Sequence, residues 1–124
     1  MITEDYVSFE TAKLLKEKGF NEDSWFHYDV DGDIVMKGYR LNMPEDIPAW
    51  TLQMAMKWLR EVHRLIISPK YNEVKDERGL LYSMWFFDIL PISKTLPVVE
   101  YNQSYDTYEE ACEAAIKYCL ENLI

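Results

Sequence analysis

The chain has few of the residues from which catalytic and metal sites are usually built. Its 124 residues include four glycines, two cysteines and two histidines. Four scattered glycines leave no Gly-rich loop to cradle a phosphate group, and the histidines and cysteines form no clustered ligand set for zinc. No serine lies in the strand–turn–helix motif of a hydrolase nucleophile. The sequence therefore predicts no catalytic residue, no metal ligand and no cofactor.

Long apolar runs and an excess of positive charge are also missing. No apolar run approaches the roughly 20 residues of a membrane-spanning helix, and the acidic start MITEDYVSFE lacks the basic and apolar regions of a signal peptide. With 22 acidic and 13 basic residues, the formal net charge is −9. Such a field repels nucleic acids and anionic membranes. We expect a cytoplasmic protein that binds neither.

Hydrophobic residues are plentiful at 48% of the chain, and 28% of the residues are charged. This balance is typical of a folded globular protein, and the length predicts one domain spanning residues 1–124. Cys112 and Cys119 lie seven residues apart in a helical pattern, about 10 Å along a helix axis, which is too far for a disulfide. Both fall on the apolar face, so we expect two buried free thiols.

Three helices are predicted from apolar residues at helical spacing and from end signals. The predicted ranges are 9–18, 49–63 and 107–123. Ser8 is placed to cap the first helix, and Gly19 is placed to end it in a left-handed conformation. Thr107 and Glu110 form the capping box of the last helix.

A β-hairpin is predicted where Asp31-Gly32 separates two β-prone runs. A two-residue Asp-Gly loop needs positive φ at both residues and fixes the strand register. That register places Tyr28 opposite Val35.

The remaining strands are predicted from shorter patterns. Residues 65–68 resemble a strand that Pro69 ends, and residues 70–79 are polar and turn-like. Residues 81–90 are apolar on both faces, as in a central strand covered on two sides, and residues 98–101 form an edge strand. We therefore expect an α+β domain in the order helix-hairpin-helix-strands-helix, with three helices packed against an antiparallel sheet of four or five strands.

Three alternate aspartates, Asp29, Asp31 and Asp33, invite comparison with a calcium-binding loop. An EF-hand loop that begins at Asp29 needs glycine at its sixth position and glutamate at its twelfth. Ile34 and Arg40 occupy these positions. We therefore interpret the aspartates as part of a turn and expect no metal there.

One surface candidate stands out on the middle helix. Trp50, Met54 and Trp58 are spaced four residues apart, beside the apolar stripe that we assign to the core. Aromatic residues and methionine are enriched in the centres of protein interfaces, so we predict that this ridge contacts another protein or a second copy of the chain. The alternative is that residues 91–103 cover it.

Three segments resemble an uncharacterised family of small proteins from gut bacteria and their phages and mobile elements. The segments are TAKLLKEKGF at 11–20, TLQMAMKWLREVH at 51–63 and YEEACEAAIKYCLENL at 108–123. The resemblance covers the three predicted helices. It implies a shared fold and no assigned activity.

Taken together, these features favour a non-catalytic protein-interaction or accessory module. The alternative is an acidic mimic of nucleic acid that occupies a DNA-binding protein, suggested by the charge of −9. An enzyme with an unrecognised site ranks third.

Overall fold

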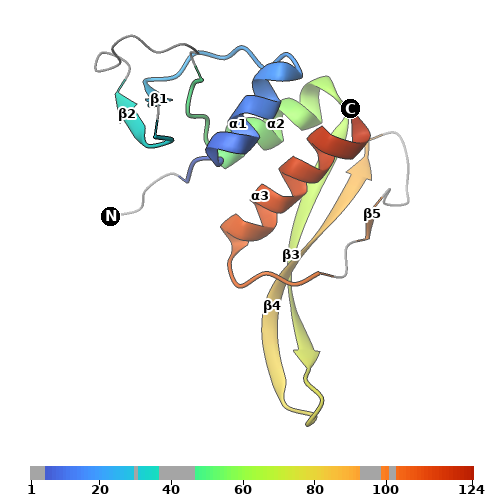
Figure 1. Ribbon diagram of the computed structural model, residues 1–124. Helices are drawn as coiled ribbons and strands as arrows, with labels where there is room; N and C mark the ends of the chain where they lie inside the picture. Colours follow the sequence, from blue (N-terminus) through green and yellow to red (C-terminus); the bar gives the residue numbers. More distant parts are fainter. Residues whose placement is uncertain (1–4, 30, 37–46, 93–98, 101–102) are drawn as a thin grey trace.

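The computed structural model describes residues 5–29, 31–36, 47–92, 99–100 and 103–124, and shows three helices beside one long β-hairpin (Figure 1). In chain order the elements are α1 (Phe9–Glu17), β1 (Phe26–Tyr28), β2 (Ile34–Met36), α2 (Leu52–Val62), β3 (Leu65–Lys75), β4 (Leu81–Pro91), β5 (Val99–Glu100), α3 (Tyr108–Tyr118) and the π-helical turn η2 (Cys119–Leu123). The predicted α+β class with three helices is confirmed. None of the described helices is long and apolar enough to cross a membrane.

The described strands form two antiparallel sheets rather than the one that we predicted. Within the described residues, β1 pairs with β2 and makes two further backbone hydrogen bonds to residues 47–49, while β3, β4 and β5 form a second sheet in that order. β4 is the central strand of this sheet, as predicted for residues 81–90, but its pairing with β5 extends over two residues only. The second sheet is therefore mainly the hairpin of β3 and β4.

The prediction that Pro69 ends a short strand is wrong, because β3 continues through it to Lys75. Ile92 N donates to Arg64 O and Asp76 N donates to Leu80 O at the two ends of the hairpin. With the observed register, even-numbered residues of β3 bond to β4, and the backbone groups of odd-numbered residues face the free edge. Pro69 is odd-numbered, so its missing N–H interrupts no bond to β4.

The β1–β2 turn differs from the prediction by one residue. Tyr28 lies opposite Ile34 instead of Val35. Gly32 adopts a φ of 84°, whereas the preceding aspartate does not take positive φ, and Gly32 N donates to Asp29 O over 3.1 Å. A turn followed by a left-handed glycine is typical of a three-residue hairpin loop, which shifts the register.

Helix ends follow the local capping signals. The side chains of Ser8 and Thr107 accept hydrogen bonds from backbone N–H groups three residues ahead, and so confirm both predicted N-caps. Gly19 N donates to Lys16 O and Phe20 N donates to Leu15 O, the bond pair of a Schellman motif.

The core lies where the helices cover one face of the base of the β3–β4 hairpin (Figure 1). The buried residues of the hairpin that reach it are Leu65, Ile67, Phe87 and Ile89. Glu113 on α3 joins the first helix to the last, because its Oε1 accepts from Ser8 N over 2.9 Å and from Thr11 Oγ1 over 2.8 Å. A carboxylate is well placed at the positive end of α1.

Candidate functional site

The β3–β4 hairpin extends well beyond the first, N-terminal turn of α3 (Figure 1). We call the projecting part, residues 71–84, the arm. The last helix-side support is at Trp85, whose backbone exchanges two hydrogen bonds of 2.8 and 2.9 Å with Tyr105. The Trp85 ring packs edge-on against Tyr108 and touches Tyr71, with ring centroids 5.2 and 5.0 Å away. Beyond this point no other strand among the described residues pairs with the arm, which forms a two-stranded ribbon.

Large apolar side chains of the arm are open to solvent. The exposed fractions are 60% for Tyr71, 60% for Leu80, 59% for Leu81 and 46% for Tyr82. A two-stranded hairpin with no further cover is at best marginally stable in water, and exposed apolar clusters commonly mark protein contact sites.

The tip of the arm is nevertheless a well-formed turn. Asp76 Oδ1 accepts from Arg78 N over 2.8 Å and from Leu80 N over 2.9 Å. Gly79 has a φ of 81°, and Gly79 N donates to Asp76 O over 3.0 Å. The turn therefore holds its shape through local bonds.

Trp50, predicted to be an exposed contact residue, is instead buried, with an exposed fraction of 1%. Thr51 caps α2 with extended backbone, φ −75° and ψ 158°, so Trp50 precedes the helix and does not lie one turn before Met54. Its ring packs edge-on against Phe20 at 4.5 Å, and its indole N–H donates to Glu22 O over 2.8 Å. The segment after α1, not residues 91–103, supplies these contacts; residues 93–98 and 101–102 lie outside the described part of the chain.

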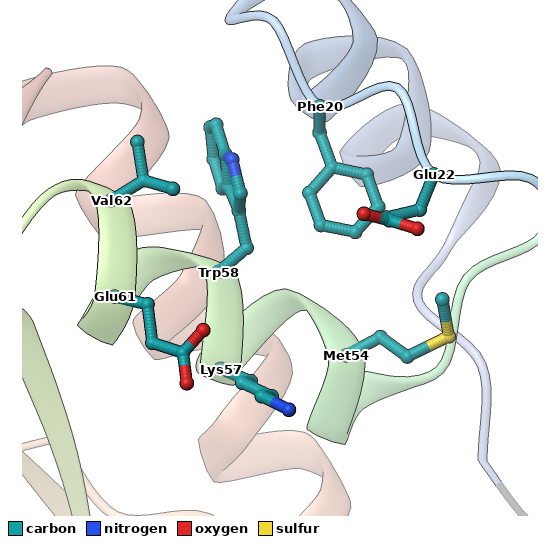
Figure 2. A pocket seen from close by; sticks show the side chains of 7 residues that line it. All are labelled: Phe20, Glu22, Met54, Lys57, Trp58, Glu61 and Val62. Carbon is teal, nitrogen blue, oxygen red and sulfur yellow. The ribbon is translucent and has the colours of Figure 1, made fainter.

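Met54 and Trp58 are half-buried and line an open cleft of about 380 Å³ between α2 and the segment after α1 (Figure 2). The lining side chains are Phe20, Glu22, Met54, Lys57, Trp58, Glu61 and Val62. Phe20 and Trp58 meet edge-on at 5.2 Å. The cleft thus has an apolar floor and charged margins, and it can accept an apolar side chain from another molecule.

The two histidines have different surroundings. His27 is buried, with its Nε2 3.0 Å from Ser24 O. The ring of His63 packs against Trp58 at 4.6 Å. Burial lowers the pKa of His63, and the positive charge of Lys18 lowers it further.

The groups whose pKa values are most raised lie in the core. Cys112 and Cys119 are free and buried, as predicted. Burial raises the pKa of Cys112 to about 11 and that of Cys119 to about 12. Burial also raises the pKa of Tyr28, whose hydroxyl donates to Val7 O. None of these three side chains lines the cleft at Met54 and Trp58.

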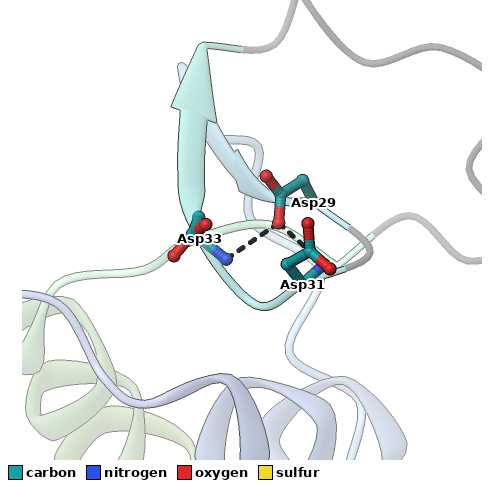
Figure 3. A group of neighbouring side chains, drawn as sticks. All are labelled: Asp29, Asp31 and Asp33. Carbon is teal, nitrogen blue, oxygen red and sulfur yellow. Dashed lines mark hydrogen bonds between the residues drawn. The ribbon is translucent and has the colours of Figure 1, made fainter.

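The three aspartates of the β1–β2 turn gather their carboxylates within 4.8 Å (Figure 3). Asp29 Oδ1 accepts from Asp31 N and Asp33 N, each over 2.9 Å. An aspartate that bonds to the backbone two residues ahead is typical of an Asx turn. The hydrogen bonds of the turn therefore account for an aspartate at position 29. That the three aspartates bind no metal stays a prediction.

The comparisons with known proteins give no relative. The chain matches no protein-family model, no curated protein and no solved structure. The geometry of the arm and the cleft is therefore the basis on which a function can be inferred.

Proposed function

We propose that this protein is a non-catalytic protein-interaction or accessory module whose main contact surface is the arm. The observation that carries the proposal is the exposure of Leu80, Leu81 and Tyr82 at the end of a projecting, two-stranded hairpin. A contact that covers these side chains both buries apolar surface and supports a ribbon that is marginal alone.

Met54 and Trp58 form a second contact surface in this proposal. The cleft includes two of the three residues of the predicted contact ridge, Met54 and Trp58, whereas Trp50 is buried. Val62 lies at its margin with an exposed fraction of 58%, so a partner side chain that enters the cleft also covers Val62.

The charge of the arm favours a protein partner over the acidic-mimic alternative. The arm, residues 71–84, carries three acidic and two basic side chains. A mimic of nucleic acid needs carboxylates in rows, as phosphates are. The overall charge of −9 in turn disfavours nucleic acid as the partner. The family of small proteins that the helices resemble implies no activity and is compatible with this proposal.

Site-specific photo-crosslinking in cells tests the proposal. A photoreactive phenylalanine analogue is placed at Tyr82 on the arm, at Val62 beside the cleft, and at Trp25 as the control. Trp25 is aromatic and 79% exposed but lies outside both surfaces. We expect defined covalent adducts from Tyr82 and none of the same mass from Trp25.

The pattern of adducts separates the two surfaces. If only Val62 gave adducts, the main contact surface would be the cleft and not the arm. If neither Tyr82 nor Val62 gives an adduct that Trp25 lacks, the protein-interaction proposal is wrong.

A further inference from the structure

We infer that the partner of the arm is a second copy of this chain, bound by antiparallel pairing of the free edge of β3 about a two-fold axis at Val74. This inference rests on the proposed function, because it names the molecule that the arm contacts. Within the described residues, β3 is the outer strand of its sheet and pairs on one side only. Its other side presents unpaired backbone groups, a template for another strand.

The usable part of this edge is short and well defined. Odd-numbered residues of β3 direct their N–H and C=O groups outward, as the bonds at the two ends of the hairpin establish. Pro69 has no N–H to offer, so the strip of complete donors and acceptors begins at Tyr71. It continues through Glu73 and Lys75, both of which are exposed.

Two-fold symmetry restricts the register. In an antiparallel pair, opposite residues share a face, so an axis perpendicular to the sheet must pass through a residue rather than between two. An axis at Val74 sets Glu73 opposite Lys75 of the second copy, and Lys75 opposite its Glu73. Each dimer then has two opposite-charge pairs, both at positions where the backbones exchange hydrogen bonds. Neither side chain has an ion pair or hydrogen bond among the described residues.

The neighbouring registers are poorer. An axis at Glu73 sets like charges face to face, and an axis at Lys75 does the same. An axis at Asn72 sets Lys75 opposite Pro69, where one backbone bond is lost. The charges of the strip therefore select the axis at Val74.

The same axis builds a continuous apolar row. Tyr82 lies opposite Val74 in the β3–β4 hairpin. Pairing at Val74 produces a row of Tyr82, Val74, then Val74 and Tyr82 of the second copy, across a four-stranded sheet. Such a sheet gives each ribbon the additional strands that a lone hairpin lacks, and the strip is short enough for a weak, concentration-dependent dimer.

A cysteine at the axis gives the sharpest geometric test. Opposite residues at a position without mutual hydrogen bonds have Cα atoms about 4.5 Å apart, within disulfide range. Val74→Cys should therefore form an intermolecular disulfide under mild oxidation. Asn72→Cys is the matched control, because it lies on the same face and strand but about 13 Å from its own copy across the axis. The native cysteines are buried and do not compete.

Charge exchange tests the register without a covalent bond. Glu73→Lys and Lys75→Glu should each weaken association by about tenfold, because two attractive pairs become repulsive. The double variant Glu73→Lys/Lys75→Glu restores both pairs and keeps the net charge, so it should dimerise as the wild type does. An equimolar mixture of the two single variants should form heterodimers, since each supplies the charge that the other lacks. Glu17→Lys, an exposed change on α1, controls for the altered net charge of Glu73→Lys.

Sedimentation velocity over a concentration series, with circular dichroism to verify folding, reads out these variants. A wild type that stays monomeric at every concentration overturns the self-pairing. The register is wrong if the charge reversals leave the dimer affinity unchanged. It is also wrong if Asn72→Cys forms an intermolecular disulfide as fast as Val74→Cys does. If Tyr82 crosslinks to a different protein while the chain does not self-associate, the interaction proposal stands and this inference falls. Absence of any Tyr82 adduct contradicts the arm as the main contact surface, whereas the self-pairing is decided by sedimentation and by the Val74→Cys disulfide.

Discussion

The two halves of the β3–β4 hairpin differ in their surroundings more than in their composition. At the base, Leu65, Ile67, Phe87 and Ile89 are buried under the helices. On the arm, Leu80, Leu81 and Tyr82 are about as apolar and remain 46–60% exposed. The same hairpin thus serves as core at one end and as free surface at the other. An apolar strand residue is therefore buried in this hairpin only where a helix covers it.

The largest effect is expected in the helical body that covers the base. Trp50→Ala should lower the free energy of unfolding by about 4 kcal/mol, since it removes a buried aromatic ring and its bond to Glu22 O. Trp25→Ala is the matched control: its side chain is 79% exposed, and its loss should change stability by no more than about 0.5 kcal/mol. Urea unfolding measures both. A small effect at Trp50 would place this side chain on the surface, as the sequence first suggested.

The next largest difference in the free energy of unfolding is expected between the two ends of β4. Ile89→Ala at the base should cost about 3 kcal/mol, because the side chain is fully buried. Leu81→Ala on the same strand should cost about 0.5 kcal/mol or less, because its side chain is 59% exposed. The same urea titrations report the difference. Equal losses would mean that the side chain of Leu81 is as buried as that of Ile89.

The smallest effect should be confined to the arm. Gly79→Ala places a side chain at a φ of 81°, with no atom within 4 Å of the added Cβ, so the cost is backbone strain of about 1 kcal/mol. Amide hydrogen exchange should accelerate at the arm and stay unchanged at the base. Uniform acceleration along the hairpin would show that the two halves open together.

Local signals in the sequence predict the helix ends, and long-range surroundings decide the rest. Ser8, Gly19 and Thr107 act within four residues of themselves, so their roles can be predicted from the sequence. Thr51 carries the same kind of signal, and its assignment as the N-cap of α2 would have removed Trp50 from the predicted ridge.

Pro69 and the arm could not be placed in this way. Whether proline ends a strand depends on which side of the strand has a neighbour, and that is set by β4. The polar segment 70–79 was predicted to be turn-like, and residues 76–79 do form the turn, but the backbone of residues 70–75 pairs with β4. The candidate contact surface was therefore only partly predicted: Met54 and Trp58 line the cleft, and the arm was missed.

The bonds of Glu113 also set the order in which the molecule can fold. They join α1 to a residue 105 positions away from Ser8 and 102 from Thr11, whereas the β3–β4 turn closes within a few residues. Local contacts form quickly and distant ones late, and a chain made from its N-terminus cannot complete distant contacts until the later segment exists. The β3–β4 turn can therefore begin to form before the bonds between α1 and α3 are made, and the hairpin gains its full stability only when the helices cover its base.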